Sequence, residues 1–175
     1  LEIYLSLSWD YVLETGGILS HAPESDVADE SLLWLGQAYQ ALGENADAVQ
    51  TYTRLIVVAS SDERRQVGQD RLTRLLQHQI RSFYDRKAWV PLLKFHADHQ
   101  DAFQLVPLER ERLFMVAQAY QHVKLPAEAW HWYGQLLKEY PNSPLREDIR
   151  LQQVVVAQEQ GNGALVREAA ASYLQ

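Results

Sequence analysis

Apolar residues recur every three or four positions along most of this chain, which is the period of an α-helix with one buried face. The clearest such segments are residues 29–42, 45–59, 110–123 and 126–140. The first two segments are separated only by a turn at Gly43, and short turns of this kind make neighbouring helices pack antiparallel. No segment shows the alternation typical of a strand. The pattern therefore predicts an all-α fold built from helix pairs.

The tetrapeptide Gln-Ala-Tyr-Gln occurs at residues 37–40 and again at residues 118–121. Each copy is followed at matching spacings by alanine, tyrosine and leucine, which are Ala48, Tyr52, Leu55 and then Ala129, Tyr133, Leu136. Because the two copies are separated by the length of two helix-pair repeats, a third, diverged copy is expected between them. We align the third copy midway between the other two. Its residues are then Leu72, Leu75, Leu76, Gln79, Ala88, Leu92 and Phe95.

These signals divide the chain into five segments of one predicted domain, residues 1–175. They are a flanking helix and loop (1–28), repeat 1 (29–60), a diverged repeat 2 (61–104), repeat 3 (105–143) and a partial or terminal helix pair (144–175). The flanking segment is read as a helix over 1–15 and a loop over 21–28, with Ser25 or Asp26 capping the next helix. Pro91 predicts that its helix starts late or is kinked.

The run Leu35-Gly36-x-x-Tyr39, followed by Gly43, Ala48 and Tyr52, resembles the signature of the tetratricopeptide repeat. A second match comprises Val116, Ala117, Tyr120, Ala129, Tyr133 and Pro141, with Lys124 in place of the turn glycine. The resemblance implies a right-handed solenoid of antiparallel helix pairs, with about three repeats plus flanking helices. It also implies a non-enzymatic scaffold that binds a peptide or protein partner on the concave face of the superhelix.

The run from Ala129 to Pro144 looks like repeats in bacterial envelope proteins of the Tol–Pal accessory or outer-membrane assembly lipoprotein type. This narrower likeness implies the periplasm or cell envelope, with the cytoplasm as the alternative. The chain begins at Leu1 without an initiator methionine, and we read it as an excised segment or a processed chain.

The formal net charge is −7, and the three segments 1–60, 61–100 and 101–175 carry −8, +3 and −2. An acidic chain lacks the basic footprint that general nucleic-acid binding requires. The absence of cysteine excludes disulfides and thiol catalysis. Since no apolar run approaches the ~18 residues that a membrane-spanning helix needs, direct membrane insertion is not expected. The basic middle segment between acidic flanks is the most informative feature of the charge distribution.

In the repeat family that the chain resembles, the first helix of each pair lines the concave face. Helical phase then predicts a partner-binding groove lined by Gln37, Gln40, Arg74, Gln77, Arg81, Phe114, Gln118, Gln121 and His122. Its amide side chains can hydrogen-bond the main chain of an extended peptide. The alternative is that glutamine is simply a good helix former on a solvated surface.

Three further clusters have a structural interpretation beside a functional one. Arg71, Arg74, His78 and Arg81 share one helix face and either bind a carboxylate or phosphate or, as favoured here, neutralise acidic neighbours. His96 and His99 either begin a metal site or, as favoured here, mark a solvated helix end. Trp130, Trp132 and Tyr133 either form a ligand platform or, as favoured here, pack between repeats.

No catalytic motif is present, so no catalytic residue, metal or cofactor is predicted. The favoured hypothesis is a non-enzymatic adaptor for a protein or peptide partner. The alternative is a structural or self-assembly segment of a larger bacterial envelope complex that handles outer-membrane proteins or polysaccharide. In that case Leu5 and Trp9 at one end, or Val154 and Val155 at the other, would form contacts in a homo-oligomer or larger stack. A third hypothesis is an accessory region of an enzyme.

Overall fold

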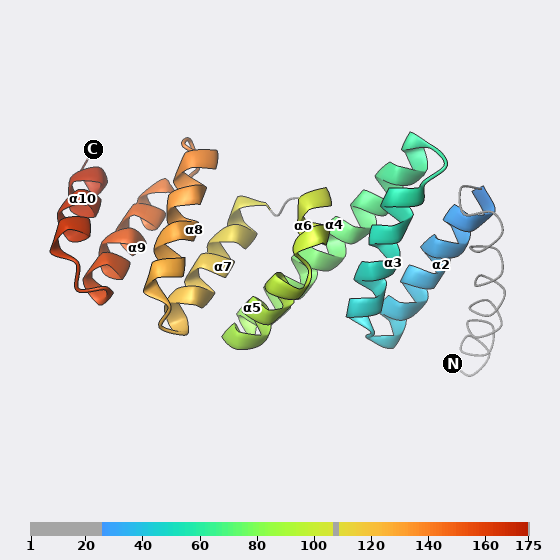
Figure 1. Ribbon diagram of the computed structural model, residues 1–175, viewed down its shortest axis with the longest axis horizontal. Helices are drawn as coiled ribbons and strands as arrows, with labels where there is room; N and C mark the ends of the chain where they lie inside the picture. Colours follow the sequence, from blue (N-terminus) through green and yellow to red (C-terminus); the bar gives the residue numbers. More distant parts are fainter. Residues whose placement is uncertain (1–25, 107–108, 175) are drawn as a thin grey trace. The chain divides into compact units, whose positions relative to one another are not determined.

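The computed structural model describes residues 26–106 and 109–174, and within these residues all regular elements are helices (Figure 1). In chain order they are α2 (Asp26–Leu42), α3 (Asn45–Val58), α4 (Asp62–Asp85), α5 (Trp89–Asp98), α6 (Gln100–Leu105), α7 (Arg110–His122), α8 (Pro126–Glu139), α9 (Arg146–Glu159) and α10 (Gly163–Tyr173). The all-α prediction is confirmed. The flanking helix predicted over 1–15 lies outside the described residues.

The described residues form two compact units. The first contains residues 26–76 and 99–106, and the second contains residues 77–98 and 109–174. Helix α4 contributes to both units, and the boundary lies between Leu76 and Gln77. Each unit therefore has its own core.

The core of the first unit is centred on the antiparallel pair α2 and α3. Leu32, Ala48, Tyr52 and Leu55 are buried there, with almost no exposed surface. Gly36 lets the two helices approach, because a Cβ at this position would lie 2.4 Å from Cε1 of Tyr52. The glycine of the repeat signature is thus a point of close approach between the two helices.

A buried carboxylate ties the end of α3 to the start of α2. Asp29 is fully buried, and its Oδ2 accepts hydrogen bonds from the backbone N–H and the hydroxyl of Ser60, at 2.9 and 2.5 Å. The same Ser60 hydroxyl also lies 2.8 Å from Oδ1 of Asp26. Asp26 is the first residue of α2, and Asp26–Ala28 are helical rather than part of the predicted loop. The buried Asp29 joins the helix pair to the following connection.

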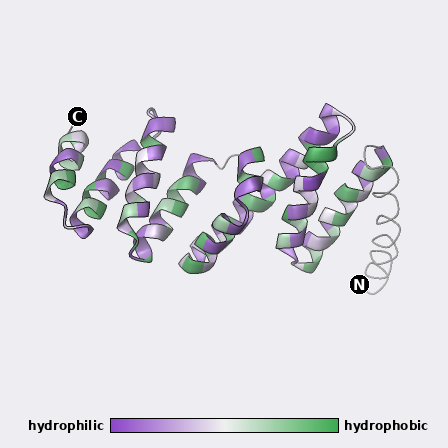
Figure 2. Ribbon diagram, viewed as in Figure 1, coloured by the Kyte–Doolittle hydropathy of each residue, from purple (hydrophilic) through white to green (hydrophobic). Residues whose placement is uncertain are grey.

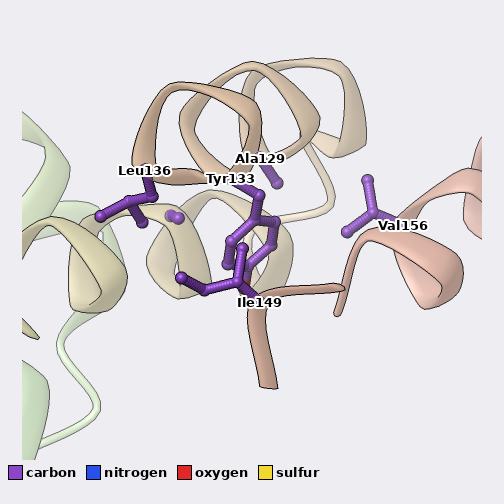
Figure 3. Packing of buried hydrophobic residues seen from close by; sticks show 6 residues of the cluster. Ala129, Tyr133, Leu136, Ile149 and Val156 are labelled. Carbon is purple, nitrogen blue, oxygen red and sulfur yellow. The ribbon is translucent and has the colours of Figure 1, made fainter. Parts of the chain in front are cut away.

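The core of the second unit gathers side chains from α7, α8 and α9 around Tyr133 (Figure 3). The cluster consists of Ala117, Ala129, Tyr133, Leu136, Ile149 and Val156. Each helix carries hydrophobic and hydrophilic positions along its length, and the cluster collects the hydrophobic ones (Figure 2). Tyr133 is fully buried, as is its counterpart Tyr52 in the first unit. Burial raises the pKa of Tyr52 to about 12 and that of Tyr133 further still.

Four of the described helix pairs turn at a residue with positive φ. These turn residues are Gly43 (79°), Lys87 (56°), Lys124 (62°) and Gly161 (67°). Each lies two residues before the next helix begins. Each also donates its backbone N–H to the carbonyl oxygen three residues earlier, at 2.9 to 3.1 Å. Glycine adopts this conformation easily, whereas for another residue it costs about 1–2 kcal/mol.

Counted from the turn residues, the predicted alignment of the middle repeat is wrong by four residues. Tyr52 and Tyr133 lie nine residues after their turn residues, and the residue nine after Lys87 is the buried His96. The predicted alignment had placed Leu92 there. Four residues are about one helical turn, so both alignments keep apolar side chains on the same face. Only the position of the turn distinguishes them.

Two further differences concern the middle of the chain. Helix α5 begins at Trp89, so Pro91 lies in its first turn, where a missing N–H removes no helical hydrogen bond. The start is late only relative to the predicted alignment, because α5 begins two residues after its turn residue, as in the other three helix pairs. Helix α6 was not predicted, because six residues are too few to show a period. It packs against α3 in the first unit and buries Ala102.

Candidate partner-binding site

A polar cavity of about 350 Å³ opens on the second unit, where the C-terminal part of α7 meets α9. We call it the polar cavity and define it by its lining residues, which are Gln118, Gln121, His122, Lys124, Gln152 and Glu159. Three of them, all on α7, belong to the predicted groove. The other three come from the α7–α8 turn and from α9. Helical phase thus identified one wall of the cavity.

The amide group of Gln118 is held by a tyrosine hydroxyl. The O–H of Tyr84 donates to Oε1 of Gln118 at 2.6 Å. One of the two acceptor positions of this oxygen is therefore filled within the protein, and the bond holds the amide in place. The NH₂ group of Gln118 carries two donor hydrogens that it can offer to a ligand.

Gln121, one turn further along α7, is held in the same way. The O–H of Tyr133 donates to its Oε1 at 3.0 Å. The first unit repeats this arrangement at the equivalent positions, where Tyr52 donates to Oε1 of Gln40 at 2.7 Å. Gln40 and Gln121 are thus partly structural, since each accepts the hydroxyl of a buried tyrosine, and Gln118 accepts that of the half-buried Tyr84. Both interpretations offered for them, binding and ordinary surface helix, missed this role.

His122, the last residue of α7, lies face to face with an indole. Its ring centroid is 4.3 Å from that of Trp89, and the two planes are 7° apart. Tyr84 in turn packs edge-on against Trp89, at 5.4 Å and 73°. His122 is exposed, so its ring is stacked on Trp89 and is also accessible at the rim of the cavity.

The charged part of the polar cavity is an ion pair between Lys124 and Glu159. Nζ of Lys124 lies 3.1 Å from Oε1 of Glu159. The two side chains differ in exposure, at 77% for the lysine and 29% for the glutamate. Lys124, like Lys87, is also a turn residue that adopts positive φ without being glycine. The sequence showed only that lysine replaced a glycine here, and it did not show that the lysine lines a cavity.

The remaining predicted groove residues do not line the polar cavity. Gln37, Gln40 and Arg74 belong to the first unit. In the second unit, Arg81 makes an ion pair with Asp85 on its own helix at 3.0 Å, and Gln77 is half-buried. Phe114 packs against the ring of Tyr133, with centroids 5.8 Å apart. Phe114 therefore supports the core beneath the site.

The turn residues also change which residue of the middle repeat corresponds to Gln37 and Gln118. Gln37 and Gln118 lie six residues before their turn residues, and the residue six before Lys87 is Arg81 rather than Gln77. A glutamine therefore occurs at this position in two helix pairs and an arginine in the third. The predicted alignment of the middle repeat had placed Gln77 at this position instead.

His96 is buried, not solvated as the sequence interpretation favoured. Only 6% of its surface is exposed, and its ring packs edge-on against Trp132 at 5.2 Å. Burial lowers the pKa of His96 to about 4. His99 lies beyond the end of α5, as the residue that precedes α6. In the described part of the chain, no group of three or more histidine, cysteine or acidic residues is placed to hold a metal ion.

The tryptophans divide between packing and exposure. Trp130 and Trp132 both pack against the core cluster of the second unit, as predicted. Trp130 also borders a shallow hollow on α8 together with His131, Gly134, Gln135, Lys138 and Glu139. Trp34 on α2 is 52% exposed, so packing does not account for it within the described residues.

Helix length and apolar content rule out a membrane-spanning helix anywhere in the described ranges.

Residues 30–58 match a family model described as the tetratricopeptide repeat. This segment covers most of α2 and α3, including Gly36, Gly43 and Tyr52, which carried the resemblance in the sequence. The comparison with curated proteins found no match. Repeats of this family generally mediate protein–protein interactions, and the match supports that general role for the pair α2–α3.

Proposed function

We propose that this protein is a non-enzymatic interaction module that binds an extended segment of a protein partner at the polar cavity. The observation that carries the proposal is the arrangement of Gln118 and Gln121. Both amides line the cavity, and both have their carbonyl oxygen engaged by a tyrosine hydroxyl. Each therefore presents NH₂ donors, which main-chain carbonyl groups of a peptide accept.

Preorganisation is what favours binding at this site. A free surface glutamine loses side-chain entropy when it binds a ligand, at about 0.5–1.5 kcal/mol for each immobilised side chain. Gln118 and Gln121 are already held in the free protein, and His122 is already stacked on Trp89. These side chains therefore lose little further entropy when the partner binds. A modest number of polar contacts is then enough to stabilise the complex.

The partner is best found by photo-crosslinking from inside the cavity. A photoreactive amino acid at position 152 lies in the polar cavity on α9, whereas one at position 50 lies on an exposed part of α3. A protein crosslinked from position 152 and not from position 50 is the expected result. Equal crosslinking from both positions would contradict the assignment of the site.

Calorimetry with the identified partner then tests the contacts. The double substitution His122→Ala with Gln152→Ala should weaken binding about tenfold or more, because two polar contacts of about 1 kcal/mol each are lost. The matched control is Gln50→Ala, which removes an exposed glutamine elsewhere. Circular dichroism establishes that the double variant is folded. Unchanged affinity in a folded double variant would move the partner away from the cavity.

Self-assembly is the second candidate function. Val154 and Val155, which the sequence suggested as contact residues, are half-buried in α9, and α10 packs against that helix. The exposed apolar residues of this helix pair are instead Leu151, Tyr173 and Leu174, of which Leu174 is 84% exposed. A mass that rises with concentration in light scattering, and that Leu174→Asp abolishes, would support self-assembly. The predicted envelope location stays a prediction.

A further inference from the structure

We infer that the polar cavity recognises a side-chain carboxylate of its partner, and that Glu159 takes the place of this carboxylate in the free protein. The inference rests on the proposed function and adds the chemistry of the ligand. Its starting point is Lys124, whose ammonium group lies 3.1 Å from Oε1 of Glu159 at the cavity.

Lys124 adopts positive φ at its turn, as Lys87 does, and of these two lysines only Lys124 lines the cavity. Positive φ is sterically unfavourable for a residue with a Cβ, and glycine at the equivalent turn residues Gly43 and Gly161 avoids that conflict. Lys124 places a cation at the cavity that glycine cannot supply.

The donors around the cavity favour an acceptor with negative charge. Gln118 and Gln121 offer NH₂ groups, and a tyrosine hydroxyl bound to each carbonyl oxygen holds these amides in place. Lys124 adds an ammonium group, which has donors and no acceptor. Glu159 is the only carboxylate among the six lining residues. The two oxygens of one carboxylate can accept hydrogen bonds from several of these donors. Such charge-assisted hydrogen bonds are about twice as strong as neutral ones.

Glu159 occupies this position only loosely. Its partner Lys124 is 77% exposed, and ion pairs that are so accessible contribute little to stability. The two residues lie on different elements, at the α7–α8 turn and at the end of α9. A ligand carboxylate can therefore replace Glu159 beside Lys124 without disturbing the core. In this arrangement Glu159 competes with the ligand, and its removal strengthens binding.

Nuclear magnetic resonance with a capped glutamate provides the test. The probe is N-acetyl-glutamate N′-methylamide, which has one side-chain carboxylate and no terminal charge. Its neutral counterpart is N-acetyl-glutamine N′-methylamide, and N-acetylglycine supplies a terminal carboxylate instead. The readout is the shift of the side-chain NH₂ signals of Gln118 and Gln121 in the full chain. We expect the capped glutamate to move these signals at lower concentration than either other probe.

Variants with opposite expected effects make the test specific. Lys124→Gly should weaken binding of the capped glutamate about tenfold, as the loss of a charged hydrogen-bond partner does. Its control is Lys87→Gly, which relieves positive φ at a lysine that does not line the cavity. Glu159→Gln should strengthen binding about threefold, because an exposed ion pair no longer competes. Its control, Glu168→Gln, makes the same change of charge on α10 outside the cavity.

Each outcome bears on the inference. Equal binding of the charged and neutral probes would overturn the carboxylate preference while leaving the proposed peptide site intact. Preference for N-acetylglycine would overturn the assignment to a side chain in favour of a chain terminus. Weaker binding in Glu159→Gln would overturn the competition by Glu159. If no partner were crosslinked from position 152, that result would instead count against the proposed function itself.

Discussion

Tyr52 lies so close to the backbone of Gly36 that a Cβ at position 36 would approach its ring to 2.4 Å. Tyr52 is fully buried and is fixed by its hydrogen bond to Gln40, so it has no room to move away. The substitution Gly36→Ala should therefore lower the free energy of unfolding by about 1–3 kcal/mol, as overpacking does. Urea denaturation measures this change.

Gly134 provides the control for that experiment. It also lies inside a helix, α8, but a Cβ there would meet only Nε2 of Gln153, at 3.8 Å. Gly134→Ala should raise stability by about 0.5–1 kcal/mol, since alanine is the better helix former. If both variants were destabilised equally, the close contact with Tyr52 would not be the cause.

The turn residues lead to a second prediction. Lys87→Gly and Lys124→Gly should each stabilise the protein by about 1 kcal/mol, because glycine adopts positive φ without steric conflict. Gly43→Ala and Gly161→Ala should destabilise it by a similar amount for the same reason. Denaturation midpoints of the four variants measure the effect. Destabilisation by both lysine-to-glycine changes would show that these turns are not strained.

A third prediction concerns the tyrosine that holds Gln121. Tyr133→Phe removes the hydroxyl 3.0 Å from Oε1 of Gln121 and should cost about 1 kcal/mol of stability. It should also weaken partner binding at the polar cavity, because the amide of Gln121 is no longer held. Tyr52→Phe removes the equivalent bond to Gln40 in the first unit. It should lower stability similarly while leaving binding at the cavity unchanged, as calorimetry would show.

The buried His96 predicts a dependence of stability on pH. Its pKa in the folded protein is about 4, below the 6.5 of an unperturbed histidine, so the unfolded chain takes up the proton more readily. Its contribution is fully present above pH 6.5 and is lost as pH falls from 6.5 towards 4. Between pH 7 and pH 5 the free energy of unfolding should decrease by about 2 kcal/mol through this residue.

The substitution His96→Gln separates this effect from that of the acidic residues. Glutamine does not titrate, so the variant should be less stable at pH 7 but should lose less stability on acidification than the wild-type protein. Urea denaturation at both pH values gives the comparison. Equal losses in the two proteins would mean that His96 is not the group responsible.

Much of the fold was readable from the sequence because its signals are local. The helices around Tyr39, Tyr52, Tyr120 and Tyr133 were predicted to within a few residues, since amphipathic period and turn residues are properties of short segments. The middle repeat was misaligned because a shift of one helical turn preserves that period. Helix α6 was missed because its six residues are held by packing against α3.

Only some of the residues that line the polar cavity, the candidate site, could be predicted from the sequence, for a related reason. Helical phase identified Gln118, Gln121 and His122, which share one face of α7. It could not supply Gln152 and Glu159, because they reach the same cavity from α9, which follows α7 only after the whole of α8. It also could not show that Tyr84 and Tyr133 engage the glutamine carbonyls, since those contacts join different helices.

The sequence by itself determined the helix pairs of the first and third repeats, their turns, and the small and aromatic residues at which these helices meet. These follow from backbone preferences and from burial of one helix face, both of which act within a few turns of helix. Only the tertiary structure decided which polar atoms remain available at the surface. That depends on which side chains from other helices have already engaged them, as Tyr133 does with Gln121 and Glu159 does with Lys124.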